Sequence, residues 1–253
     1  IPLLEIVAAR ALVSLVLSYI DVRRKGLSVW GTHRTLLAAR GIVGSLALIC
    51  VYYALMTLPL AEATLLQYMH PMFAALLGLL LLKEGIQRST VICIVFSITG
   101  LIVMVEPGVF TGAAPALPSL GVAVALLGAF GSAMAYVLVR RLSLEEDASV
   151  IIFYFPLVAL PLSVAILGDQ FVMPDGQSLV LLLMVGIFTQ IGQLGLTHAM
   201  RYGTAGKTAA YSYVQIIFAV VLGWVVFAEL PSLWTYVGGG LIIAGALFNV
   251  IRR

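Results

Sequence analysis

The chain repeats itself at a shift of 145 residues. Without a gap, that shift carries Tyr68 onto Tyr213. It also pairs identical residues at Gly41 and Gly186, Phe73 and Phe218, Ala74 and Ala219, Leu77 and Leu222, Gly78 and Gly223, Glu84 and Glu229, and Gly100 and Gly245. Soluble solenoids repeat about every 20 to 50 residues. A repeat this long in an apolar chain indicates a duplicated membrane bundle, an arrangement found in secondary transporters.

The composition independently predicts an all-α polytopic membrane protein. Hydrophobic residues make up 62% and charged residues 10% of the 253 residues, and the mean hydropathy is +1.13. Soluble domains carry about 25% charge, and a helix crossing a bilayer needs about 20 apolar residues. The sequence predicts nine such spans, at residues 2–20, 36–56, 62–82, 89–105, 119–139, 150–168, 177–198, 206–228 and 232–250.

The basic residues predict the orientation of these spans. Every second connection is basic, through Arg23, Arg24, Lys25, Arg34, Lys83, Arg88, Arg140, Arg141, Arg201, Arg252 and Arg253. The other connections, at 57–61, 106–118, 169–176 and 229–231, contain no lysine or arginine. Cytoplasmic loops are enriched in both. We therefore expect an integral protein of a bacterial inner membrane with a cytoplasmic C-terminus.

Repeat and orientation together predict two inverted halves. Span 36–56 and its counterpart 177–198 are separated by an odd number of spans, so they cross the membrane in opposite directions. We assign residues 1–118 to the first repeat and 119–253 to the second, inverted one. The counterpart of span 119–139 would lie upstream of Ile1. We therefore expect an inverted 5+5 plan whose first helix is missing from this chain.

Two long stretches resemble the EamA-type transporters of the drug/metabolite transporter superfamily. They are ALMTLPLAEATLLQYMHPMFAALLGLLLLKE at 54–84 and AMRYGTAGKTAAYSYVQIIFAVVLGWVVFAE at 199–229. Arg10 and AYVLVRRL at 135–142 also resemble that family. The resemblance covers essentially the whole chain. It implies a ten-helix transporter with a central cavity between the repeats, and relatives that include amino-acid exporters and nucleotide-sugar carriers.

Polar residues inside the spans are the candidates for substrate binding, because each needs a partner away from lipid. In span 62–82, Gln67 and His70 share one helix face. The repeat shift carries them onto Ser212 and Gln215, which are also polar. Two related polar patches are therefore predicted near the midplane. The alternative is that these groups only join helices to one another.

Pro71 and Tyr211 adjoin these patches. Pro71 follows His70 and lacks a backbone N–H, so we predict a kink or hinge there. Tyr211 lies four residues from both Lys207 and Gln215 and beside Ser212, which makes it a candidate substrate contact.

A second polar stripe occupies span 177–198. Gly186, Gln190, Gln193 and Thr197 fall on one narrow face, and two glutamines facing lipid would be costly. We therefore expect Gln190 and Gln193 to face a cavity or another helix. Their amides would recognise a polar organic solute rather than an inorganic ion.

Arg10, Tyr68 and Tyr213 complete the candidate set. Arg10 lies near the middle of the first span and could hold a carboxylate or phosphate, or have a structural partner. Tyr68 and Tyr213 are repeat-related and deep in their spans. Glu5 and Arg10 are five residues apart on a helix, so they are not expected to pair.

Other function classes lack their motifs. The sequence has no HExxH, GxSxG elbow, P-loop or TVGYG filter, and the two cysteines, Cys50 and Cys93, lie inside spans. We expect no enzyme activity, cofactor, metal or nucleic-acid partner. The predicted function is export of a small polar metabolite, of amino-acid or organic-acid type, by alternating access. The partners would be this substrate, the bilayer and a possible second copy in a homodimer. The alternatives are an exchanger of nucleotide-like solutes and a non-transporting scaffold.

Overall fold

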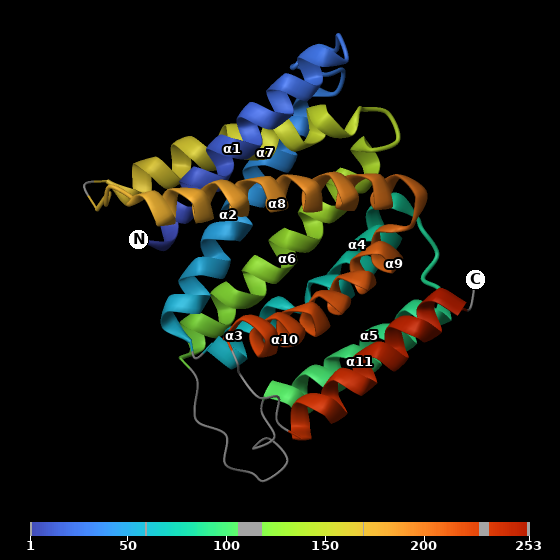
Figure 1. Ribbon diagram of the computed structural model, residues 1–253. Helices are drawn as coiled ribbons and strands as arrows, with labels where there is room; N and C mark the ends of the chain where they lie inside the picture. Colours follow the sequence, from blue (N-terminus) through green and yellow to red (C-terminus); the bar gives the residue numbers. More distant parts are fainter. Residues whose placement is uncertain (1, 59, 106–117, 169, 228–232, 252–253) are drawn as a thin grey trace. The chain divides into compact units, whose positions relative to one another are not determined.

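The computed structural model describes residues 2–58, 60–105, 118–168, 170–227 and 233–251, and this part of the chain is helical (Figure 1). The helices are α1 (Leu3–Arg24), α2 (Arg34–Thr57), α3 (Leu60–Gln67), α4 (His70–Leu82), α5 (Arg88–Val105), α6 (Ser119–Leu142), α7 (Ala148–Leu167), α8 (Gly176–Tyr202), α9 (Ala205–Ala210), α10 (Val214–Phe227) and α11 (Leu233–Ile251). A 3-10 turn, η2 (Tyr211–Tyr213), separates α9 from α10.

The predicted all-helical polytopic fold is confirmed. In the described part, α2, α6, α7 and α8 are long and apolar enough to cross a membrane. Two predicted spans are not continuous helices. The span predicted at 62–82 is divided into α3 and α4, and the span predicted at 206–228 is divided into α9, η2 and α10. The two breaks lie at related positions, because the repeat shift carries Tyr68 onto Tyr213.

The chain forms two compact units, and each takes segments from both predicted repeats. One unit comprises Ile1–Leu46 and Leu138–Gly203, and the other comprises Ala47–Val137 and Thr204–Arg253. We call them the first and second unit. The predicted repeat boundary at residues 118 and 119 describes a correspondence in sequence and stays a prediction.

In the first unit, α1 packs against α7 and α8. Glycine permits the approach between α1 and α8: a Cβ added to Gly186 would lie 2.5 Å from the Cβ of Val13. Arg140, in the part of α6 that belongs to this unit, donates from Nη1 to the carbonyls of Met200 (2.8 Å) and Arg201 (2.9 Å). This guanidinium therefore caps the C-terminal end of α8, where carbonyls lack helical partners.

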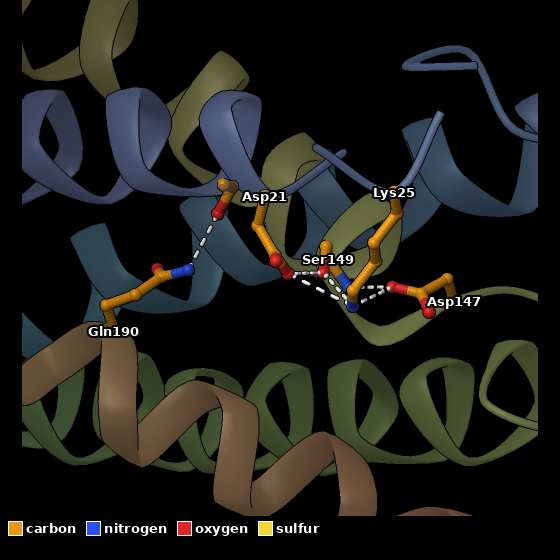
Figure 2. Close-up of polar contacts among 6 residues, drawn as sticks. Asp21, Lys25, Asp147, Ser149 and Gln190 are labelled. Atoms are coloured by element: carbon orange, nitrogen blue, oxygen red, sulfur yellow. Dashed lines mark hydrogen bonds and ion pairs between the residues drawn. The ribbon is translucent and has the colours of Figure 1, made fainter. Parts of the chain in front are cut away.

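A charged cluster joins α1 to the start of α7 in the same unit (Figure 2). Lys25 Nζ lies 3.0 Å from Asp147 Oδ1, 3.1 Å from Asp21 Oδ2 and 2.9 Å from Ser149 Oγ. Asp147 also caps α7 by accepting the Ser149 N–H at 2.9 Å. The basic connection predicted from the sequence is thus partly neutralised by Asp21 at the end of α1 and by Asp147 from a distant segment.

In the second unit, α5 and α11 pack side by side along their lengths (Figure 1). A Cβ added to Gly100 on α5 would lie 2.5 Å from the carbonyl oxygen of Gly238 on α11. Leu101 and Ile242 are fully buried near this contact, together with Tyr213. This packing places the buried Tyr213 in the core that surrounds the two helix breaks.

Candidate functional site

The break between α3 and α4 follows from Pro71. Proline has no N–H to donate, so the carbonyl of Gln67 lacks its helical donor. The His70 imidazole replaces that donor, because its Nδ1 lies 3.0 Å from the Gln67 oxygen. The residue that precedes the proline thus satisfies the carbonyl that the proline leaves free, and the kink predicted at Pro71 is a complete interruption of the helix.

A second carbonyl at this break is satisfied from α9–α10. The N–H of Met72 donates to Met69 (3.1 Å) instead of to Tyr68, which leaves the Tyr68 carbonyl without a helical donor. The hydroxyl of Tyr213 donates to that carbonyl at 2.9 Å. The two tyrosine rings stack at a centroid distance of 6.0 Å. The two helix breaks therefore contact each other directly.

Side-chain contacts extend this contact region. The Gln215 amide donates to the Tyr68 hydroxyl at 2.7 Å, and the Gln67 amide donates to Ser132 Oγ on α6 at 3.2 Å. The Tyr136 ring meets the His70 ring edge-on at 5.3 Å. We call the following set the helix-break cluster: Gln67, Tyr68, His70, Ser132, Tyr136, Ser212, Tyr213 and Gln215.

Ser212 shares one proton between two acceptors. The Gln67 carbonyl can only accept, so the hydrogen of His70 sits on Nδ1 and a neutral imidazole accepts at Nε2. Ser212 Oγ lies 3.2 Å from that Nε2 and 2.6 Å from the Ala209 carbonyl. A hydroxyl has one hydrogen, so it serves one acceptor at a time. When Ser212 donates to Ala209, the Nε2 of the buried His70 is left without that donor.

The exposure of the side chains divides the cluster into buried residues that support the backbone and accessible residues that can contact a ligand. His70 and Tyr213 are buried, and their bonds satisfy the broken backbone. Gln215 is exposed, and Gln67, Tyr68 and Ser212 are half-buried, so their polar groups can reach a ligand. The described cluster contains amides, hydroxyls and one imidazole but no carboxylate. Such groups recognise a polar solute through hydrogen bonds.

Two further sequence candidates lie in the first unit, and the structure gives them different surroundings. Gln190 is buried on α8, and its amide donates to Ser18 Oγ on α1 at 2.9 Å (Figure 2). Its side-chain oxygen accepts from Ser14, also on α1. Gln193 is half-buried, and its side chain makes no hydrogen bond to the described residues. Gln190 therefore joins two helices, which was one of its two predicted roles, and Gln193 keeps a free amide.

The structure also gives the surroundings of the remaining polar residues that the sequence singled out, Arg10, Tyr211 and Lys207. Arg10, half-buried on α1, has a buried Nε with no hydrogen-bond partner in the described part of the chain. Tyr211 is half-buried in η2. Lys207 Nζ lies 3.3 Å from Gln87 Oε1. Glu84, two residues after the end of α4, accepts the N–H of Ala205 at 2.8 Å at the start of α9.

The sequence reasoning missed four polar residues. Ser14 and Ser18 follow Arg10 at four-residue intervals, so their shared face was a readable signal. Ser132 bonds Gln67 from α6, and no pattern indicated that partner. Arg40 is buried in α2 with its guanidinium 5.1 Å from the Phe155 ring centroid, a cation–π contact.

Comparison with known proteins shows the family of this chain. The model of the EamA-like transporter family matches residues 1–106 and 119–251. The pseudopaline exporter CntI of Pseudomonas aeruginosa is 32% identical over 248 residues, covering 98% of this chain and 86% of that protein. Human solute carrier family 35 member G1 is 29% identical over 231 residues, covering 87% of this chain and 63% of that protein.

A solved crystal structure has the same fold. It superposes with a TM-score of 0.85, covers 100% of this chain and 90% of its own, and shares 19% sequence identity. At that identity the likeness concerns the fold alone.

Proposed function

Because this chain belongs to the EamA-like transporter family, we propose that it exports a small polar organic metabolite by alternating access. Family membership makes it a membrane transporter and not an enzyme. The substrate class that we propose is an amino acid or related organic acid. Export is the direction named for its Pseudomonas relative.

The observation that carries this proposal is the contact between two repeat-related helix breaks. Secondary transporters commonly build their substrate sites from discontinuous helices near the midplane. Here both breaks lie in one unit, joined through Tyr213 and Tyr68. Moving one broken helix against the other would exchange hydrogen bonds among Ser212, His70 and Gln215. Pro71 is the hinge that we propose for this motion.

The chemistry of the accessible groups supports the substrate class. Amides and hydroxyls can bond to both ends of a zwitterion, and the cluster has no carboxylate for a lipophilic cation. Within the first unit, Gln193 and Arg10 carry polar atoms that no described residue binds, and we propose them as further substrate contacts there. The half-buried Tyr68 and Tyr211 would supply hydroxyls.

Orientation and assembly extend the proposal. The basic connections support an inner-membrane protein with a cytoplasmic C-terminus. A homodimer would use α11, where a Cβ added to Gly239 or Gly240 would meet no atom within 4 Å. Cysteine labelling from either side of the membrane tests the orientation, and crosslinking at α11 tests the dimer.

Counterflow in proteoliposomes tests the function. Vesicles loaded with unlabelled amino acids or organic acids should take up the labelled substrate transiently and with saturation. His70→Ala should lower the rate several-fold, because a lost buried hydrogen bond costs about 1–3 kcal/mol. His198→Ala, an exposed histidine on α8, is the matched control and should transport like wild type.

Two outcomes would overturn the proposal. Non-saturable flux would indicate a channel, and transport confined to lipophilic cations would exclude the metabolite class. Alternating access has its own test: a crosslink that closes the outer mouth should block outside labelling of a cavity cysteine and leave inside labelling intact. Equal labelling from both sides of that locked state contradicts the mechanism.

A further inference from the structure

The first unit contains an apolar cavity remote in sequence from the helix-break cluster. Its volume is about 460 Å³, within the range of small-molecule sites. The walls come from the N-terminal half of α1, the C-terminal half of α7, the segment after it and the start of α8. They include Leu12, Val13, Val164, Phe171, Leu179 and Leu183.

This cavity opens on a surface suited to hydrocarbon. Leu12, Val164, Phe171 and Leu179 line it and are each about half exposed. Leu12, Val164 and Leu179 lie on α1, α7 and α8, and their exposed apolar surface is suited to contact with a hydrocarbon chain. The mouth of the cavity is therefore suited to the apolar chain of an amphiphile.

One ionisable side chain lines the cavity. Glu5, on α1, is 3% exposed. Its Oε2 accepts the N–H of Val172 at 3.1 Å. Its Oε1 is buried and has no hydrogen-bond partner in the described part of the chain. Arg10, five residues further along α1, forms no ion pair with it there. Glu5 thus places in the wall of the cavity a carboxyl group whose buried Oε1 has no partner in the described chain.

The apolar walls and the unpaired oxygen of Glu5 together define which molecules could occupy the cavity. A buried carboxylate without a partner is costly, and a hydrogen bond to a charged group is among the stronger ones. A neutral alkyl chain would fill the apolar walls but leave Oε1 unpaired. An anion would be repelled, and a small polar metabolite would lose its hydration against apolar walls. A primary ammonium on an apolar chain satisfies both features.

We propose that this cavity binds an amphiphile whose protonated primary amine pairs with Glu5 and whose apolar chain lies along α1, α7 and α8. The site is separate from the export proposal, because no helix-break residue lines it. Two sources share this chemistry: a bilayer lipid with an ethanolamine headgroup, and a free long-chain amine.

Photolabelling in nanodiscs tests the proposal. The probe is a dodecylamine that carries a diazirine on its chain, and the protein is reconstituted in phosphatidylcholine. Labelled peptides should map to the cavity walls on α7 and α8. Unlabelled dodecylamine should compete at least about tenfold better than dodecanol at equal bilayer mole fraction, and a tenfold preference corresponds to about 1.4 kcal/mol.

Two variants distinguish the effect of the Glu5 carboxylate from the effect of the cavity volume. Glu5→Gln keeps an acceptor for the Val172 N–H but removes the charge, so the advantage of dodecylamine over dodecanol should disappear. Leu183→Trp fills the cavity without altering Glu5 and should abolish labelling there. Glu145→Gln, which removes an exposed carboxylate outside the cavity, is the matched control and should label like wild type.

The competition experiments decide whether the proposal holds and which kind of amphiphile binds. Equal competition by dodecanol, or unchanged labelling in Glu5→Gln, would overturn the proposal and leave an apolar groove for acyl chains. Competition by phosphatidylethanolamine added to the nanodisc supports it and identifies a lipid as the occupant. Competition by dodecylamine but not by that lipid also supports it and identifies a free amine.

Discussion

The hydroxyl of Tyr213 donates a 2.9 Å hydrogen bond to the carbonyl of Tyr68, its counterpart 145 residues earlier in the chain. The reverse bond is not made. The Tyr68 hydroxyl instead accepts from Gln215 at 2.7 Å. Two equivalent positions have therefore taken different roles: Tyr213 is buried and supports the broken backbone, and Tyr68 is accessible enough to contact a ligand.

This relationship predicts that Tyr213→Phe destabilises the protein. The ring would still pack, but the Tyr68 carbonyl would lose its donor, which costs about 1–3 kcal/mol when the group is buried. Thermal unfolding in detergent should show a lower midpoint for Tyr213→Phe. Tyr202→Phe, which removes a hydroxyl from an exposed ring, should leave the midpoint unchanged. Equal midpoints in both variants would mean that the Tyr68 carbonyl finds another donor.

The two glutamines of α8 are predicted to separate stability from transport. Gln190→Ala removes the amide that bonds to both Ser14 and Ser18 and leaves the two buried serine hydroxyls without it, so it should destabilise by about 1–3 kcal/mol. Gln193→Ala removes an amide that no described residue binds, so it should leave stability nearly unchanged and weaken transport several-fold. The midpoint of unfolding and the counterflow rate measure the two effects. Wild-type kinetics in Gln193→Ala would remove it from the proposed substrate site.

Gly100 should not tolerate alanine. The added Cβ would meet the backbone oxygen of Gly238 at 2.5 Å, and a backbone atom cannot rotate away as a side chain can. Overpacking of this kind costs about 1–3 kcal/mol. Gly239→Ala, on α11 at a position with no atom within 4 Å, is the matched control and should change stability by less than about 1 kcal/mol. Equal stability of the two variants would show that α5 and α11 are further apart.

The charged cluster at Lys25 predicts a pH-dependent contribution to stability. Burial opposes ionisation of Asp147, but hydrogen bonds from Ser149 and Lys25 dominate and lower its pKa below 3.8. For Asp21, the bond from Ser149 is the largest effect and lowers the pKa as well. Burial would lower the pKa of Lys25, but its bonds to the two acids raise it above 10.5.

The directions of the two pKa shifts determine how the contribution of Asp147 and Lys25 to stability changes with pH. A lowered carboxyl pKa gives stability that is present above pH 3.8 and lost as pH falls through the folded value. A raised lysine pKa gives stability that is present below pH 10.5 and lost as pH rises through its folded value. Wild type should therefore exceed Asp147→Asn in unfolding midpoint across the neutral range, with a difference that shrinks in acid.

Two features make this comparison specific. Asparagine also caps helices, so Asp147→Asn keeps the bond from Ser149 and removes only the charge. The side chains of Asp147 and Lys25 are 34% and 40% exposed, so salt should reduce the difference. A difference that is independent of both pH and salt would assign the effect to the cap instead.

Part of the candidate site could be predicted from the sequence. The repeat shift placed Gln67 with Ser212 and His70 with Gln215, and the structure shows His70 bonded to Ser212. Pro71 marked the first break through its missing N–H. No proline marks the break at Tyr211–Tyr213, and only its correspondence to the first could have indicated it. Ser132 could not be found, because its bond to Gln67 depends on how α6 packs.

The apolar length of the spans by itself determined that this is an all-helical membrane protein, because the bilayer as solvent requires each span to satisfy its own backbone groups. The EamA family followed from the resemblance of residues 54–84 and 199–229 to that family. Only the tertiary structure decided which polar side chains form hydrogen bonds between helices and which stay available to a ligand. Gln190 and Gln193 lie three residues apart with the same side chain, and only the approach of α1 at Gly186 gives Gln190 two serine partners. Glu5 likewise became a candidate site only when the fold buried it in an apolar cavity with one oxygen unpaired.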